Sequence, residues 1–390
     1  MIPLLRRKFN RDWTPAAYAR FLALLEERSG GATRFRHSET PCFLPAPLVD
    51  RMARYGREMV QQLLADVEYQ RDSRAAIPER YRVPNEPAIP LFVQADFGLD
   101  AQGEPRLVEI QGFPSLYSYQ PVMAECYREA YGLDAGLAAL PGGLPLDRYY
   151  ALLGEAIVGA HDPANVILLE IDPERQKTRC DFTVTERLFG VRAVDVRAVR
   201  KRANRLWYER DGRWTPVERI YNRAIVDELE RRAIKTPFDF RDDLDVEWAG
   251  HPNWFFRLSK FSLPYLHHPA APAAQFLNRV TRVRQPERYV LKPLYSFAGL
   301  GVVVGPTGEQ IDAIPAARRG DYLLQERVDF APVVETPAGP AKIEVRIMYL
   351  WQDEMRAVNT IVRMGRGAQM GVDHNKGFEW VGASAGFIAS

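Results

Sequence analysis

Three side chains that could bind a metal through oxygen, Asp96, Glu109 and Gln111, lie in the segment 91–112, LFVQADFGLDAQGEPRLVEIQG. One apolar stretch ends near Asp96, residues 100–103 are typical of a turn, and a second apolar stretch carries Glu109 and Gln111. Residues two apart on a strand share a face, and pairing across the turn brings Asp96 to the same end of the hairpin. Mg²⁺ prefers such oxygen ligands together with substrate phosphates. The hairpin is therefore a candidate metal site, although by itself a Glu-x-Gln pair is more often a solvent-facing edge.

A second segment, 289–305, has the sequence YVLKPLYSFAGLGVVVG. We expect a strand ending at Lys292, a loop of small residues and another apolar strand. Glycines let backbone N–H groups approach phosphate oxygens closely. The segment lacks the G-x-x-x-x-G-K-[ST] pattern, and it leads into a strand rather than a helix. It is a candidate phosphate loop, although an isolated glycine-rich turn is more often a plain hairpin.

Other polar groups are weaker candidates. The strand at 322–328 has a polar exit that could offer backbone groups to a purine, or could be an ordinary strand end. Residues 373–375, Asp-His-Asn, could be a metal pair but fit a substrate-contacting loop better. The pair His267 and His268 is expected at the surface. The cationic run 197–205 favours a solvated edge over nucleic-acid contact.

Several elements must position these groups. Thr14 and Pro15 begin a helix that ends at Gly30, and apolar spacing predicts a second helix over 47–69. Residues 72–90 are expected to be a loop. A helix is expected over 177–189 between strands at 166–171 and 191–196, which indicates a small parallel-sheet unit. Further predicted helices cover 121–131, 147–161 and 259–266, and further predicted strands lie at Val290, Val302, Tyr322, 343–350 and 355–362.

Composition bounds the class of protein. The 390 residues are 46% hydrophobic and 26% charged, which is ordinary for a folded domain. Lys and Arg number 52 against 50 Asp and Glu, so the net charge of +2 argues against nucleic acid as a partner. Cys42, Cys126 and Cys180 form no CxxC motif, which favours a reducing, cytoplasmic setting. No membrane-spanning stretch or signal peptide is expected.

Together these motifs resemble the ATP-grasp superfamily, in the circularly permuted arrangement of eukaryotic glutathione synthetases and glutathionylspermidine synthetase. In that arrangement the metal-binding strand pair precedes the ATP-binding lysine, as it does here. The resemblance covers most of residues 89–390 through dispersed motifs. It implies an α+β fold with an inserted Rossmann-like α/β substrate lobe. The expected parts are an N-terminal helical region (1–88), a first ATP-grasp part with the metal hairpin (89–145), the substrate lobe (146–252) and the nucleotide-binding part (253–390).

The resemblance also implies roles by position. The metal ligands are Asp96, Glu109 and Gln111. The positions that contact ATP are Lys260, Lys292, Ser296, Gly299, Gly301, Gln325, Glu326, Val328 and Asp329. Arg346 and Arg363 match arginines near the phosphoryl or acyl group, and residues 377–386 resemble a small-residue loop that closes over the site. Two departures stand out: Gln94 occupies a position where the family often has arginine, and Ser296 one where it often has a metal-binding glutamate.

The implied activity is an ATP- and Mg²⁺-dependent ligase that joins a carboxylate to an amine through an acyl phosphate, releasing ADP and phosphate. Arg223, Arg346 and Arg363 suggest an anionic acceptor, because guanidinium pairs bidentately with carboxylate. One alternative is a nucleotide-binding regulatory protein of the same fold that no longer ligates. Another is a phosphotransferase that needs no amine. The acid, the amine and the oligomeric state are left open.

Overall fold

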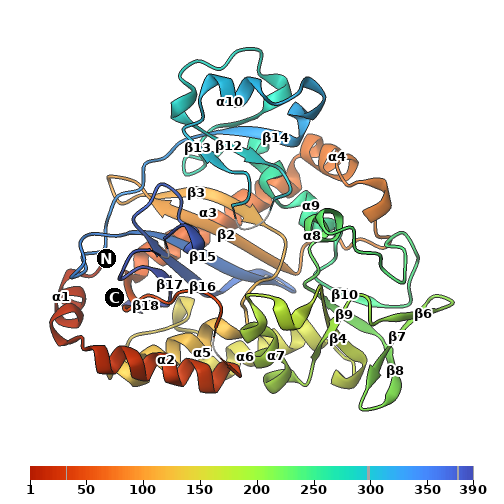
Figure 1. Ribbon diagram of the computed structural model, residues 1–390, viewed down its shortest axis with the longest axis horizontal. Coiled ribbons are helices and arrows are strands. Elements are labelled where there is room, and N and C mark those ends of the chain that lie inside the picture. Colours follow the sequence, from red (N-terminus) through yellow and green to blue (C-terminus); the bar gives the residue numbers. More distant parts are fainter. Residues whose placement is uncertain (32, 297–298, 376, 390) are drawn as a thin grey trace.

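The computed structural model describes residues 1–31, 33–296, 299–375 and 377–389. A five-stranded antiparallel sheet forms the centre of the fold, in the order β17-β16-β15-β2-β3 (Figure 1). Its strands are β2 (Phe92–Leu99), β3 (Pro105–Gln111), β15 (Lys342–Trp351), β16 (Met355–Gly365) and β17 (Gly382–Ser384). The hairpin predicted over 91–112 is thereby confirmed, and strands more than 200 residues away continue its sheet.

One face of the central sheet is covered by helix α3 (Ala46–Ala65). Alternate sheet residues such as Ala95 and Ile347 pack with Met52 and Leu63 of the helix in one apolar cluster. The helix approaches closely at Gly56, where an added Cβ would lie 2.2 Å from the Tyr349 hydroxyl. Because this face is filled, the polar side chains on the alternate positions are directed to the other face.

The single helix predicted over 47–69 is wrong. Helix α3 ends at Ala65, the backbone of Asp66 is extended, and a second helix, α4 (Val67–Ala75), follows. The Asp66 carboxylate accepts hydrogen bonds from the backbone N–H groups of Glu68 (2.8 Å) and Tyr69 (3.1 Å), so it caps α4. Helix α4 therefore includes four residues, 72–75, of the expected 72–90 loop.

A smaller antiparallel sheet lies beside β3, in the order β11-β14-β12-β13. Its strands are β11 (Ala274–Phe276), β12 (Tyr289–Pro293), β13 (Val303–Val304) and β14 (Tyr322–Glu326). The helix α10 (Gly308–Asp312) packs against them. Leu277, Leu291, Ile311 and Leu324 form the sheet's own apolar core. The helix expected at 259–266 is instead a 3-10 segment, Lys260–Tyr265, with Pro264 inside it. Proline removes a backbone donor, which disfavours a regular α-helix there.

A parallel sheet forms a separate layer at the lower right of Figure 1. Its order is β10-β9-β4-β5, with β4 (Val166–Glu170), β5 (Arg192–Asp195), β9 (Arg219–Asn222) and β10 (Glu247–Ala249). Around it lie α6 (Leu146–Val158), α7 (Arg179–Phe189), α8 (Val226–Arg231) and a three-stranded sheet of β6 (Arg200–Arg202), β7 (Arg205–Arg210) and β8 (Arg213–Val217). The predicted strand–helix–strand unit is confirmed, with every residue of β4 buried.

The N-terminal helices α1 (Pro3–Asp12) and α2 (Pro15–Ser29) pack near α5 (Tyr119–Tyr131). Thr14 caps α2 and Gly30 ends it in a left-handed conformation, as predicted. Strand β1 (Cys42–Pro45) pairs in parallel with β18 (Gly386–Ala389). The loop expected over 377–386 is therefore wrong in its second half, because β17 and the start of β18 are buried strands there.

The remaining helices are α9 (Asn253–Arg257) and α11 (Val372–Asn375). Short 3-10 segments lie at Glu79–Tyr81, Pro141–Gly143, Pro163–Asn165, Pro173–Arg175, Lys260–Tyr265, Leu277–Arg279, Pro286–Arg288 and Ala316–Asp321. None of the helices in the described ranges combines the length and apolar character that a membrane span requires.

Candidate functional site

A cavity of about 410 Å³ is lined by residues of both antiparallel sheets and of the loops around them. Thirteen of the fourteen positions singled out from the sequence line it: Asp96, Glu109, Gln111, Lys260, Lys292, Ser296, Gly299, Gln325, Glu326, Val328, Asp329, Arg346 and Arg363. The fourteenth, Gly301, lies outside this lining set. Residues as far apart in the chain as Asp96 and Arg363 thus meet around one space of the size that small-molecule sites commonly have.

The central sheet presents its polar face to the cavity in two rows. In one row Glu109, Asp96, Arg346 and Ile361 lie side by side on four adjacent strands. In the next row Glu344, Arg363 and Ala383 follow one another across β15, β16 and β17. The period of two along each strand brings these side chains onto the face opposite to α3.

A β-bulge shapes the site on strand β3. The register pairs Asp96 with Glu109 but Phe97 with Leu107, so Val108 has no opposite residue. The freed carbonyl oxygen of Val108 accepts a hydrogen bond of 2.9 Å from the Lys292 Nζ. Bulges of this kind change the direction of neighbouring side chains and are frequent beside active sites. Here the bulge joins the central sheet to the lysine of β12.

Two lysines enter from the small-sheet side. The Lys260 Nζ donates to the backbone oxygen of Ser296 (2.6 Å) and lies 3.6 Å from the Glu109 carboxylate. Lys292 is 5% exposed, and burial lowers the pKa of its amine from 10.5 to about 8, with the nearby Glu109 acting in the opposite direction. The two cations therefore converge on the hairpin carboxylate, and a phosphate placed there would stabilise the charged form of Lys292.

Asp96 is held by both arginines of the central sheet. Arg346 donates Nε to Oδ1 (2.5 Å) and Nη2 to Oδ2 (2.6 Å), and Arg363 Nη1 lies 3.3 Å from Oδ2. Burial opposes ionisation, yet the two guanidinium groups outweigh it and hold the pKa of Asp96 below its ordinary value. The carboxylate oxygens expected to ligate a metal are thus engaged within the protein.

The residue Gln94, which departs from the family pattern, belongs to the same network. Its side-chain oxygen accepts a hydrogen bond of 2.8 Å from Arg346 Nη1, and its amide nitrogen donates to the Ser115 backbone oxygen at 3.0 Å. Gln94 therefore holds the third nitrogen of the Arg346 guanidinium, Nη1, and links Arg346 to the loop after β3.

Glu344 is a site residue that the sequence reasoning missed. It is 5% exposed, it lines the cavity, and its carboxylate pairs with Arg363 Nη1. Burial raises the pKa of Glu344, while Arg363 acts against the increase. A usable signal was present, because Glu344 and Arg346 are two apart on a predicted strand and must share a face.

The hairpin retains two oxygen donors that fit a hard cation. The Gln111 amide donates to the Glu109 carboxylate, and the buried Gln111 Oε1 has no hydrogen-bond partner among the described residues. Groups of three or more His, Cys, Asp or Glu arranged for a metal are absent from the described ranges. One carboxylate and one amide suit Mg²⁺ that takes its other ligands from phosphate and water.

The glycine-rich turn lies beside the segment that connects strands β16 and β17 of the central sheet. Residues 297 and 298 of the Ser296–Gly301 loop lie outside the described residues. Gly301 has φ +74°, and a Cβ there would lie 2.9 Å from the Pro293 ring. Gln369 donates to the Val302 backbone oxygen at 2.9 Å, and buried Asn375 binds the backbone of 366–371. The Asp-His-Asn triplet thus forms a short helix, α11, beside the cavity rather than a loop.

No protein-family model matches the chain, and no curated protein matches it. Among solved structures, a glutathione synthetase-like effector from Globodera pallida, in its apo form, is similar with a TM-score of 0.58. The two sequences are 12% identical, and the match covers 100% of this chain and 97% of that one. The fold is glutathione synthetase-like. This confirms the expected mixed helix-and-sheet class, and at this identity the likeness concerns the fold alone.

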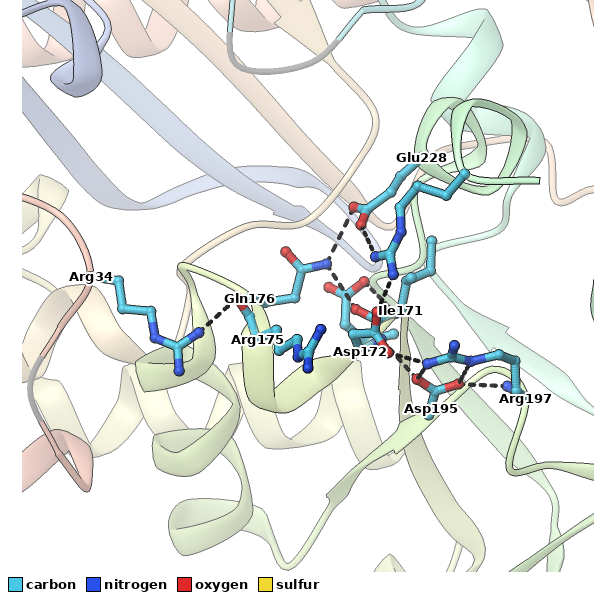
Figure 2. A network of polar contacts seen from close by, with 10 residues as sticks. Arg34, Ile171, Asp172, Arg175, Gln176, Asp195, Arg197 and Glu228 are labelled. Carbon is cyan, nitrogen blue, oxygen red and sulfur yellow. Dashed lines mark hydrogen bonds and ion pairs between the residues drawn. The ribbon is translucent and has the colours of Figure 1, made fainter. Parts of the chain in front are cut away.

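In this glutathione synthetase-like fold the parallel sheet ends in a network of ion pairs, which Figure 2 shows in close-up. Asp172 follows β4 and Asp195 ends β5, and Arg197 binds both carboxylates. Gln176 donates to the Ile171 backbone oxygen at 2.8 Å and to Glu228 at 3.2 Å. These polar groups bind one another, so the network stabilises the carboxyl ends of β4 and β5.

Arg223 and Asp181 form a second internal pair. Arg223 Nη1 lies 2.6 Å from Asp181 Oδ2, and the two side chains are 3% and 0% exposed. Asp181 also accepts hydrogen bonds from the backbone N–H groups of Leu116 (3.2 Å), Ser118 (3.0 Å) and Tyr119 (3.0 Å). Arg223, expected to hold an anionic acceptor, is therefore engaged in joining the parallel lobe to the start of α5.

Proposed function

We propose that the protein is an ATP-dependent carboxylate–amine ligase of the ATP-grasp class, in the circularly permuted arrangement. One observation carries the proposal: Lys260 and Lys292 converge with Glu109 on a single cavity between two antiparallel sheets. Cations beside a carboxylate that can hold a metal suit a triphosphate. The order of the segments along the chain, with the hairpin before Lys292 and a parallel unit between them, supports the permuted arrangement.

The residues present fit ATP and Mg²⁺. The orphaned oxygens Gln111 Oε1 and Ser296 Oγ are buried and lack partners among the described residues, which suits a bound polar group. Glu109 and Gln111 are the residues that would hold Mg²⁺, and the polar exit of β14 from Gln325 to Asp329 is the place for the base. When bound, the metal neutralises charge on the phosphates.

The reaction transfers the γ-phosphoryl group to a substrate carboxylate. A carboxylate oxygen attacks the γ-phosphorus, the bond to ADP breaks, and an acyl phosphate forms. An amine then attacks the acyl carbon, phosphate leaves, and the amine loses a proton to give the amide. Lys260 and Lys292 stabilise phosphate charge, and Arg363 orients the carboxylate. Positioning and charge neutralisation are the tasks of the protein, so no nucleophilic serine or cysteine is needed.

The test is amine-dependent release of ADP from Mg-ATP by the purified protein. Removing one electrostatic contact to the reacting group typically costs roughly 10² to 10³ in turnover, so we expect such losses for Lys292→Ala and Glu109→Ala. Glu354→Ala is the matched control, because Glu354 pairs with Arg356 on an exposed turn and is 74% exposed. Equal turnover in the wild type and both site variants would contradict the proposal.

A second function is favoured by the engagement of Asp96. Two arginines hold the Asp96 carboxylate, and Gln94 and Ser296 depart from the family pattern. Such a site suits a protein that binds nucleotide but does not catalyse ligation. Such a protein gains thermal stability with Mg-ATP but forms no ADP with any acid and amine. ADP formation that needs an acid but no amine would instead indicate a phosphotransferase.

A further inference from the structure

We propose that the acid substrate is a monocarboxylate with an apolar body about the size of a phenyl group. This inference rests on the proposed ligase function and concerns the part of the same cavity beside Arg363. It depends on three features of the site: the arginines and lysines that are already paired, the rings that line the cavity, and the balance of charge around it.

The first feature is the small number of cations available to an acid. Arg223 is paired with Asp181, and Arg346 uses three nitrogens on Asp96 and Gln94. Arg363 differs from them. Within the described ranges its hydrogen bonds all run through Nη1, to Asp96 and Glu344. A guanidinium group carries five N–H donors in a rigid fork, so the Nε and Nη2 edge of Arg363 can hold one carboxylate.

The second feature is a wall of apolar side chains in the same cavity. Its members are Phe35, Phe113, Leu116, Phe255, Ile361 and Met370. Ile361 lies two residues before Arg363 and on the same face of β16. Phe35 lies two residues before His37, which pairs with Ala383, the residue opposite Arg363. On the β3 side, the rings of Phe113 and Phe255 meet edge to face at 5.9 Å.

The third feature is charge. Among the described residues, seven Lys and Arg side chains and six Asp and Glu side chains line the cavity. A triphosphate needs the cations of the lysine side even with a bound divalent metal. A second ligand with several carboxylates would bring excess negative charge into a nearly balanced, partly buried space, which is costly. A ligand with one carboxylate on an apolar body fits both the nearly balanced charge of the cavity and its apolar wall.

The experiment replaces the unknown amine with hydroxylamine. An acyl phosphate and hydroxylamine give a hydroxamate and free phosphate, so hydroxamate and ADP are measured together. The acids are 3-phenylpropionate and 4-phenylbutyrate on one side, and glutamate, succinate and γ-glutamyl dipeptides on the other. Burial of a ring-sized apolar group favours binding by on the order of 10- to 100-fold, so we expect kcat/KM to differ by that factor in favour of the aryl acids.

Variants of the wall separate specificity from folding. Phe35 is half-buried and lines the cavity, so Phe35→Ser is expected to raise KM for 3-phenylpropionate roughly 10-fold. Leu188→Ser is the control, because Leu188 on helix α7 is a large apolar side chain that is 38% exposed and does not line the cavity. The conservative Phe113→Leu keeps an apolar wall and is expected to change KM less than Phe35→Ser.

The outcomes are distinguishable. Product from glutamate, succinate or the dipeptides, with none from the aryl acids, overturns this inference and leaves the ligase function standing. An equal KM for 3-phenylpropionate in the wild type and Phe35→Ser also overturns it. Absence of ADP with every acid contradicts the ligase function itself, and the inference then falls with it.

Discussion

Asp96 and Arg346, 250 residues apart, form a two-pronged ion pair between adjacent strands of the central sheet. The nitrogen–oxygen distances are 2.5 and 2.6 Å, and the side chains are 1% and 7% exposed. Gln94 fixes a third nitrogen of the same guanidinium group. The pair organises the polar face of the sheet, since Arg363 and through it Glu344 attach to the same carboxylate.

Asp96→Asn is expected to destabilise the protein even when metal and nucleotide are absent. Removing one partner of a buried ion pair leaves an uncompensated charge and typically costs about 3–5 kcal/mol. The measurement is the free energy of unfolding in urea, with chelator present and no nucleotide. A role of Asp96 limited to metal binding predicts instead that the unfolding curves of the wild type and the variant coincide under these conditions.

The hairpin could be predicted because its information is local. Alternating apolar residues, a turn and a second alternating stretch determine two strands, and the period of two places Glu109 and Gln111 on one face. The cap at Gly30 and the strand β4, which is buried along its whole length, are local signals of the same kind. Pairing of this hairpin with β15 depends on contacts across some 250 residues, which no local pattern encodes.

Two of the unpredicted features depend on tertiary contacts. The partner of the Val108 carbonyl at the bulge is Lys292 from another sheet, and Arg346 reaches Asp96 only because β2 lies against β15. Asp66 could have been recognised as a cap, since aspartate favours helix N-termini, but the apolar spacing on both sides concealed the break. Glu344 was within reach of the sequence, because its spacing from Arg346 already implied a shared face.

Gly301→Ala is expected to weaken nucleotide binding and to lower stability. Gly301 has φ +74°, and the added Cβ would lie 2.9 Å from the Pro293 ring beside Lys292. A non-glycine residue in such a conformation costs on the order of 1–3 kcal/mol. Gly308→Ala is the control, because Gly308 is the first residue of helix α10 and an added Cβ there has no atom within 4 Å. Thermal unfolding and titration with Mg-ATP of both variants test this, and equal behaviour of the two would show that position 301 does not require glycine.

Asp181→Asn is expected to loosen the junction between the parallel lobe and α5. The carboxylate accepts three backbone N–H groups and the Arg223 guanidinium, so an amide would turn an NH₂ group toward other donors. The loss expected for such a buried pair is about 3–5 kcal/mol. By contrast Asp211→Asn, at an exposed pair with Arg192, should cost less than about 1 kcal/mol. Urea unfolding of the two variants decides, and similar losses would contradict the assignment of Asp181 as a joint.

Lys292→Met is expected to change how stability depends on pH. The pKa of this amine is about 8 in the folded protein and near 10.5 in the unfolded chain, because burial disfavours the charge. Between these values the unfolded chain binds more protons, so the free energy of unfolding of the wild type rises with pH relative to that of the variant. Below pH 8 the variant is expected to be the more stable. Urea unfolding at pH 7 and pH 10 measures the difference, and a constant gap between the two proteins would exclude the lowered pKa.

The same amine predicts proton uptake when nucleotide binds. At pH 9 most Lys292 side chains are neutral in the free protein, since the pKa of the buried amine is about 8. A phosphate beside the amine favours its charged form and raises that pKa, so binding draws a proton from the buffer. Calorimetry of Mg-ATP binding in two buffers of different ionisation enthalpy measures the uptake directly. We expect a clear buffer dependence for the wild type and a much smaller one for Lys292→Met. If the binding heat of the wild type is the same in both buffers, the triphosphate does not lie beside Lys292. The two lysines near Glu109 would then serve a ligand other than ATP.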